Sequence, residues 1–174
     1  PPRRLARRVT NRQNELLGDA AERAAVTAEW LNQAKYPGST INEAWKRFIY
    51  HQFHDDLTGT SIPRAYEFSW NDELISLKQF SNVLTSSIHG IGRELDTRVS
   101  GIPVILYNAL GFTVTDIAEI ELDLPKAPKG ITVYDEKGKK VSAQLISYTD
   151  GKARILVEAT VPATGYVVYD VRTS

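Results

Sequence analysis

The sequence predicts an antiparallel three-helix bundle followed by an antiparallel β-sandwich-like domain. Two observations predict this fold class. Apolar residues recur at the helical spacing of three and four positions through the first half of the chain, and they alternate at every second position in the second half. We therefore assign residues 1–97 to the helical bundle and residues 98–174 to the β domain. A chain of 174 residues is long enough for two small domains.

The first predicted helix runs from about Val9 to Ala34. Its apolar residues follow the period of an amphipathic helix and form one candidate core face, which comprises Leu17, Ala20, Ala24, Ala28 and Leu31. Residues 36–38, Tyr-Pro-Gly, are expected to end this helix because proline cannot continue it.

The second predicted helix opens at Thr40, which forms a capping-box pattern with Glu43. Its core-facing residues are expected to be Ile41, Trp45, Phe48, Ile49 and Phe53. It continues into the polar run 55–60, where Gly59 suits a turn. The third helix is expected to begin near Ser61 and Pro63, and its apolar face comprises Leu74, Leu77, Leu84, Ile88, Ile91 and Leu95. The short connections predict antiparallel packing.

The β domain is expected to begin after residues 101–103, Gly-Ile-Pro, which would break any helix. In residues 118–124, apolar and acidic residues alternate, which predicts a strand with one buried and one solvated face. Other short apolar runs predict strands at 104–107, 131–134, 141–148, 154–159 and 166–171. We expect an antiparallel meander of about five strands, and an incomplete domain, because a sandwich commonly has seven or more. Tyr166 and Tyr169 fall on opposite faces, so one should pack and the other be exposed.

Composition narrows the function classes. The charges of twenty-one basic and twenty-one acidic residues cancel, and a net charge of zero argues against a nucleic-acid-binding protein. No apolar run approaches the ~20 residues of a membrane span. The absence of cysteine excludes disulfides and thiolate metal sites, but it leaves the cellular compartment open. The sequence also lacks methionine, so we expect it to be a piece of a longer polypeptide. A local basic cluster, Arg3 to Arg8, is expected to be a solvated helix start or a surface that meets another domain.

Residues 51–60, HQFHDDLTGT, concentrate side chains that can bind metals. His51 and His54 lie three apart on the predicted helix, and Asp55 and Asp56 follow directly. Neutral imidazole and carboxylate groups are good zinc ligands, but a zinc site normally needs three or more protein ligands, and the local sequence does not supply a full set. The structural alternative is that His51 packs on the bundle and that both aspartates are solvated groups at the helix end.

A longer pattern resembles the middle and following regions of glycoside hydrolase family thirty-eight α-mannosidases. It comprises Trp45 followed by HQFHDDLTGTSI, a preceding helix with NRQNELL, a third helix with proline near its start, and YNALGF at the opening of the β domain. The resemblance covers nearly the whole chain. It implies that the parent protein is a retaining, metal-dependent α-mannosidase that hydrolyses terminal α-mannosyl bonds of mannose-containing glycans.

The resemblance implies roles for two residues. His54 would be a ligand of the active-site metal, one Zn²⁺ or another divalent cation, and Asp55 would contact the sugar hydroxyls. Order and spacing match the family pattern at four positions: His54, Asp55, Gly59 and Thr60. His51 has no counterpart and is expected to be structural. Asp56 departs from the pattern, and we assign it no role beyond solvation or capping.

The resemblance also implies that the nucleophile, the acid/base and the remaining metal ligands lie in an N-terminal α/β barrel outside this chain. The chain alone would contain no catalytic residue and would be inactive. Asp55 and Asp56 do not form the catalytic pair, because a retaining glycosidase needs carboxyl groups ~5 Å apart and facing one bond, whereas adjacent helix residues point ~100° apart. The alternative function is a non-catalytic module, in which the bundle docks a protein partner and the β domain binds carbohydrate without a metal.

Overall fold

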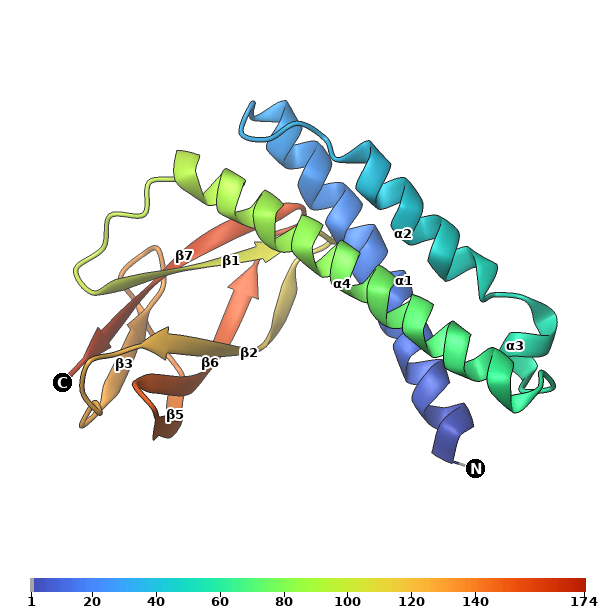
Figure 1. Cartoon of the computed structure of the whole chain (residues 1–174). Helices are drawn as coiled ribbons and strands as arrows, with labels where there is room; N and C mark the ends of the chain where they lie inside the picture. Colours follow the sequence, from blue (N-terminus) through green and yellow to red (C-terminus); the bar gives the residue numbers. More distant parts are fainter. Residues whose placement is uncertain (1) are drawn as a thin grey trace. The chain divides into compact units, whose positions relative to one another are not determined.

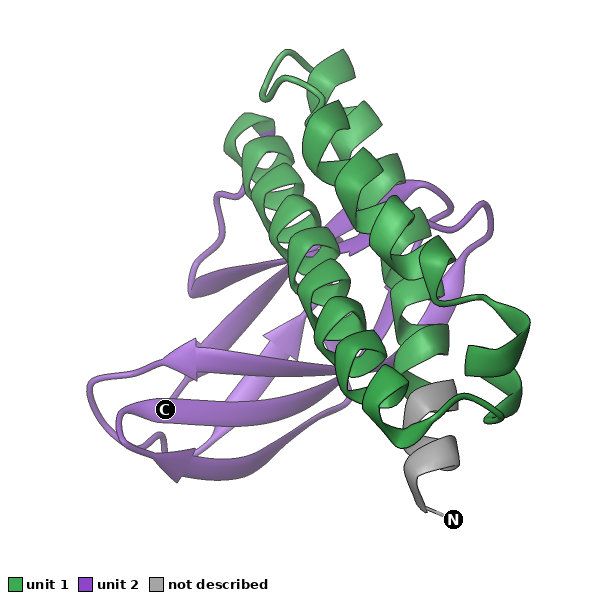
Figure 2. Ribbon diagram, turned by 45° about the vertical axis from the view of Figure 1, so that its right-hand side comes forward, with its two compact units in different colours: residues 1–94 green, residues 95–174 purple. Residues whose placement is uncertain are grey.

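The computed structural model describes the backbone of residues 2–174 and the side chains of residues 9–174, so the side chains of the basic cluster Arg3 to Arg8 lie outside the described residues. The chain divides into two compact units, residues 1–94 and residues 95–174 (Figure 2). The first is helical and the second consists of antiparallel strands (Figure 1), which confirms the predicted fold class. The boundary predicted from the sequence, between residues 97 and 98, falls slightly later in the chain.

The helical unit contains α1 (Pro2–Trp30), α2 (Gly38–Tyr50), α3 (His54–Thr58) and α4 (Pro63–Glu94). The three long helices were predicted, whereas the short α3 was not, because the second helix was expected to continue into it. Both α1 and α2 pack on α4. Within residues 2–174, every helix is either too short or too polar to span a bilayer.

Small and aromatic side chains share the core of the helical unit. On α1 the buried face consists largely of alanines, namely Ala21, Ala24, Ala25 and Ala28. These small residues allow the helices to approach closely. At Gly18 the approach is closest, since an added Cβ would lie 2.7 Å from the Trp45 ring. The Trp45 ring meets that of Phe80 edge-on at 5.0 Å between centroids, and Phe80 is fully buried. These two aromatic side chains therefore join α2 to α4.

Three predicted core residues are exposed instead. Phe53 is 55% exposed because the chain leaves the helix after Tyr50. Ile49, which is still within α2, is 59% exposed because it lies outside the buried face of that helix. Leu74 on α4 is 59% exposed. The neighbouring buried positions of α4 are occupied by the polar residues Glu73 and Ser76, which a pattern of apolar residues cannot identify. The predicted capping box at Thr40 is also wrong, because α2 begins earlier, at Gly38, and no side chain caps it.

The buried face of α4 carries a polar contact to α1. Asn14 is fully buried, and its side-chain nitrogen donates to the carbonyl oxygens of Thr10 at 3.2 Å and Glu73 at 3.0 Å. Ser76 donates to the Asn14 side-chain oxygen at 2.7 Å. Buried polar groups need partners of this kind, so the pairing also fixes how α1 and α4 align.

The β unit contains seven strands in the described residues: β1 (Ile102–Asn108), β2 (Val114–Asp123), β3 (Ile131–Tyr134), β4 (Lys140–Val141), β5 (Ala143–Thr149), β6 (Lys152–Val161) and β7 (Gly165–Thr173). They form two antiparallel sheets, with strand orders β1-β7-β3-β4 and β2-β6-β5. The prediction of a simple meander of about five strands is wrong, since the first strand pairs with the last, β7.

The predicted alternation on β2 is correct, because Ile120 and Leu122 are buried between exposed acidic neighbours. They join a core that includes Val133, Ile155 and Val171. The two tyrosines of β7 also divide as expected, with Tyr169 buried and Tyr166 exposed. Burial raises the pKa of Tyr169, whose hydroxyl accepts a hydrogen bond from the backbone N–H of Thr160.

Candidate functional site

The candidate site lies on α3, which follows a break in the helical backbone. The second helix ends at Tyr50 and His51 occupies its C-cap position. Phe53 then adopts an extended conformation (φ −54°, ψ 139°), and α3 begins at His54. His51 and His54 therefore lie on separate elements, and the prediction that they share one helix is wrong. The three-residue helical spacing therefore does not relate the directions of their side chains.

The side chains of His54 and Asp55 reach solvent together. The exposed fractions of their side chains are 76% and 45%, and His54 Nε2 lies 3.3 Å from Asp55 Oδ2. The hydroxyl of Thr60 donates to Asp55 Oδ1 at 2.9 Å. The Phe53 ring lies beside the His54 imidazole, with 4.2 Å between centroids. An imidazole and a carboxylate are thus presented side by side on the surface.

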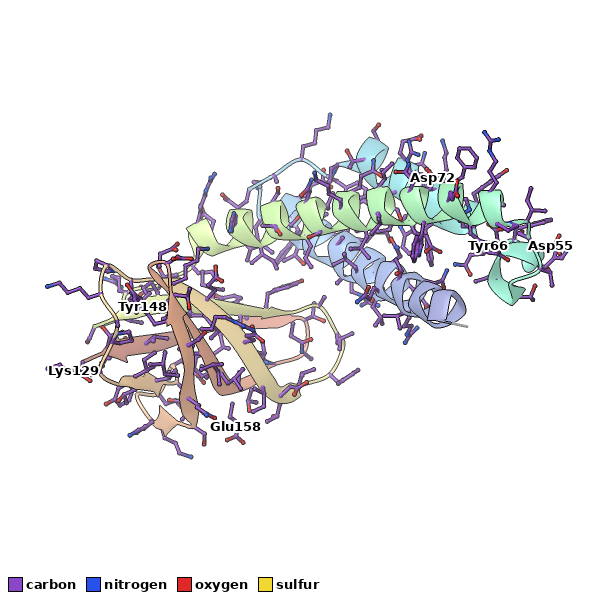
Figure 3. All side chains as sticks on the ribbon, turned by 60° about the horizontal axis from the view of Figure 1, so that its bottom comes forward. Asp55, Tyr66, Asp72, Lys129, Tyr148 and Glu158 are labelled. Atoms are coloured by element: carbon purple, nitrogen blue, oxygen red, sulfur yellow. The ribbon has the colours of Figure 1, made fainter. Side chains whose placement is uncertain are left out.

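The backbone of Asp55 is held more firmly than its side chain. Its carbonyl oxygen accepts hydrogen bonds from the N–H groups of Gly59, of Thr60 at 2.9 Å and of Ser61 at 3.2 Å. The Tyr66 hydroxyl from α4 adds a longer one at 3.4 Å. Gly59 has a φ of +87°, a conformation that favours glycine and that lets the chain turn back over the carbonyl. The candidate site therefore rests on a fixed backbone turn (Figure 3 labels Asp55 and Tyr66).

His51 is buried, with 4% of its surface exposed, and each ring nitrogen faces a carboxylate. Its Nδ1 lies 3.1 Å from Asp56 Oδ2, and its Nε2 lies 3.0 Å from Asp72 Oδ2. Arg47 donates to the other oxygen of Asp72 at 2.9 Å. This buried position agrees with the structural role expected for His51 from the sequence.

Asp56 differs from expectation. Only 8% of its surface is exposed, so it is neither a solvated group nor a cap. Besides its contact with His51, it accepts hydrogen bonds of 2.7 Å from the hydroxyls of Ser61 and Ser69. The physical reason is helical geometry, which turns adjacent side chains ~100° apart and so directs Asp56 inward while Asp55 points out. The sequence prediction missed Asp72 and Ser69 on α4 and Arg47 on α2, whose only signal was the spacing of polar residues along their helices.

His54 and Asp55 fit part of a metal site. Their imidazole nitrogen and carboxylate oxygens are donor types that zinc accepts. Among residues 9–174, however, no group of three or more histidine, cysteine, aspartate or glutamate side chains is arranged to hold a metal ion. The described residues therefore place two donor groups side by side but contain no complete metal site.

Apolar side chains surround the candidate site in the sequence without being buried. They lie on α3 and on the segments directly before and after it: Tyr50, Phe53, Leu57, Ile62 and Phe68. Such a concentration of exposed large apolar residues is typical of a surface that contacts another protein surface.

Comparisons with known proteins agree with this description. A family model described as the alpha mannosidase middle domain matches residues 4–91. The chain is similar to the crystal structure of an alpha-mannosidase from Enterococcus faecalis V583, with a TM-score of 0.75 and 18% identity over 96% of this chain. It is also similar to a protein in the glycosyl hydrolase family 38 from Enterococcus faecalis, with a TM-score of 0.76 and 19% identity over 94% of this chain. In each case the match covers 24% of the solved chain. No curated protein sequence matches significantly.

Proposed function

The chain belongs to the α-mannosidase middle-domain family, and on that premise we propose that it is part of a larger α-mannosidase. That enzyme would hydrolyse terminal α-mannosyl bonds of glycans with retention of configuration. The chain spans 24% of the two solved chains to which it is similar, which supports a role for it as one part of a larger protein. Within that enzyme, the chain would supply one wall of the active site.

His54 is the proposed metal ligand of this chain. The observation that carries the proposal is its exposed imidazole, which lies on a turn with a fixed backbone and beside a carboxylate that is also exposed. A bound Zn²⁺ or similar divalent cation would act as a Lewis acid that polarises and orients oxygen groups of the sugar. The other ligands would come from the N-terminal barrel. His54 would need to present a nitrogen lone pair, so its ring must be neutral when it binds the metal.

Asp55 is the proposed sugar contact. Its carboxylate can accept hydrogen bonds from sugar hydroxyls, and bonds to a charged acceptor are stronger than neutral ones. The Thr60 hydroxyl donates to Oδ1 and so restrains the rotation of the carboxylate. This arrangement prepares Asp55 to hold one orientation of the sugar.

The nucleophile and the acid/base of a retaining mechanism would lie outside this chain. They must stand ~5 Å apart on opposite sides of the scissile bond. Asp56 is unsuited to either role because it is buried and accepts hydrogen bonds from Ser61 and Ser69. We therefore expect no turnover by the chain alone.

The proposed partner of the apolar surface around α3 is the catalytic barrel domain. The exposed apolar residues on and around α3 would be covered by that domain, which would also bring its metal ligands up to His54. Burial of this surface would exclude water from the shared site and strengthen its electrostatic interactions.

Replacing Asp55 with asparagine in the full-length enzyme tests this function. Asparagine keeps the shape but removes the charge, so kcat/KM for a nitrophenyl α-mannoside should fall about 10-fold to 100-fold, as expected for the loss of a charge-assisted hydrogen bond. The matched control is Asp19→Asn, which removes the carboxylate of an exposed ion pair on α1 and should leave kcat/KM unchanged.

The metal requirement forms the second arm of this experiment. A chelator should abolish hydrolysis by the unmodified enzyme, and added Zn²⁺ should restore it. Full activity of Asp55→Asn would contradict the sugar contact. Mannose binding that persists in chelator, without any hydrolysis by the full-length protein, would instead favour a non-catalytic carbohydrate-binding module.

A further inference from the structure

The short helix α3 carries the candidate site but has little hydrophobic anchorage. It contains five residues, of which only Asp56 is buried. Its apolar residue Leu57 and the preceding Phe53 are exposed. Apolar burial is the usual source of stability for a helix, because short helices are marginal by themselves. Among the described residues, α3 is therefore held largely by polar contacts, namely those of the Asp56 side chain and those of the Asp55 carbonyl oxygen.

Those contacts connect α3 to both neighbouring long helices. Asp56 accepts hydrogen bonds of 2.7 Å from Ser69 on α4 and from Ser61, which lies in the turn between α3 and α4. Its Oδ2 also lies 3.1 Å from Nδ1 of His51, the C-cap residue of α2. One carboxylate thus joins α3 to the end of α2 and to α4.

His51 extends the connection to a second carboxylate. Its Nε2 lies 3.0 Å from Oδ2 of Asp72, a residue of α4, and Arg47 of α2 donates to Oδ1 of the same aspartate. The ring of Tyr50 lies against the imidazole at 5.2 Å, nearly perpendicular to it. Figure 3 labels Asp55 on α3 and Asp72 on α4.

The His51 ring lies between two carboxylates. Carboxylate oxygens only accept hydrogen bonds, and a neutral imidazole has only one N–H donor. Both ring nitrogens of His51 face carboxylates, so the N–H of either tautomer can donate to one of them. Arg47 donates to Asp72, which places a positive charge beside that carboxylate. Buried ionic groups of this kind fix a specific arrangement in some proteins.

We propose that His51 is a positioning residue, which, held between Asp56 and Asp72, fixes the orientation of α3 and hence of His54 and Asp55. This proposal rests on the proposed function for its consequence in the enzyme. His51 itself would contact neither metal nor substrate. Its loss would release α3 while the core around Trp45 and Phe80 stayed packed.

The test uses the full-length enzyme with His51→Gln and, as a milder change, Asp72→Asn. Two quantities are measured: Zn²⁺ affinity by chelator competition, and deuterium uptake by the backbone amides of residues 54–60. In both variants we expect faster uptake in this segment and unchanged uptake in the middle of α4. We expect Zn²⁺ affinity to fall about 10-fold to 100-fold, as is typical when a group that orients a metal ligand is removed.

Matched variants separate positioning from a general loss of stability. Asp19→Asn on α1 should leave both quantities unchanged, because its ion pair is exposed. Asp72→Asn should retain more affinity than Asp72→Ala, since the amide still offers His51 a hydrogen-bonding partner. Should His51→Gln fail to fold, the two Asp72 variants provide the same comparison.

Two results would overturn the proposal. One is unchanged uptake in residues 54–60 together with unchanged Zn²⁺ affinity in a folded variant. The other is uptake that rises equally along all the helices, which would indicate a general effect on stability. The uptake measurement needs no metal, so it tests the positioning role even if His54 proves not to bind Zn²⁺. In that case His54→Ala would leave Zn²⁺ affinity unchanged, and the proposed function would fail separately.

Discussion

Replacing His54 with alanine in the full-length enzyme is expected to lower Zn²⁺ occupancy and to reduce kcat/KM by roughly 1,000-fold. The physical reason is that loss of one ligand weakens a Lewis acid that supplies several kcal/mol of charge stabilisation, and each 1.4 kcal/mol is about tenfold in rate. The His54 side chain is 76% exposed in the described chain, so its removal leaves no cavity in the helical core. Thermal unfolding in the presence of chelator, where neither protein holds metal, should therefore match that of the unmodified protein.

The matched control is His89→Ala, which removes an exposed histidine of α4 by the same substitution. This control should keep its metal content and its activity. Metal analysis of the dialysed proteins and hydrolysis of a nitrophenyl α-mannoside provide the two readouts. Full metal content and activity in His54→Ala would show that the metal site lies elsewhere.

Replacing Phe80 with alanine should lower the free energy of unfolding by about 3–5 kcal/mol, the usual range for removal of a buried aromatic ring. Phe80 has no exposed surface, and its ring packs against that of Trp45 on α2. Both large side chains fill the space at Gly18, where α1 comes close. The cavity would therefore open at the junction of all three long helices, where relaxation is limited.

Urea unfolding followed by circular dichroism measures this change. The control is Leu74→Ala, which removes an exposed apolar side chain from the same helix and should change the free energy of unfolding by less than about 0.5 kcal/mol. Equal, small effects of the two substitutions would contradict the position assigned to the helical core.

The β unit shows which features of the fold a sequence pattern can predict. Alternation on β2 identified its buried face correctly, because a strand with one solvated face leaves a two-residue period in the sequence. The pairing of β1 with β7 could not be predicted, since these are the first and last strands of the unit in sequence and no local turn connects them. The pattern therefore predicted strands but not their order.

On α4 the apolar pattern predicted the helix and much of its buried face, including Ile91, but it missed the polar residues of that face. Glu73 and Ser76 are buried while the neighbouring Leu74 is exposed. Ser76 donates a hydrogen bond to Asn14, so both polar side chains can be buried, although a hydropathy pattern predicts that they are exposed. Buried polar pairs between distant segments are thus the physical reason for this error.

The candidate site was also predictable only in part. The family pattern identified His54 and Asp55, whose outward direction the structure shows. The inward direction of Asp56 could not be predicted, because it depends on the helix break at Phe53 and on Ser69 from a later helix. Local sequence therefore indicated candidate site residues, and tertiary contacts determine what holds them.

The most direct test of the proposed shared metal site is a crystal structure of the full-length enzyme grown with Zn²⁺, with anomalous diffraction measured at the zinc edge. We predict an anomalous peak about 2.0–2.1 Å from a ring nitrogen of His54, with the remaining protein ligands contributed from outside residues 9–174. A fully occupied zinc ion with no contact to His54 would contradict the account.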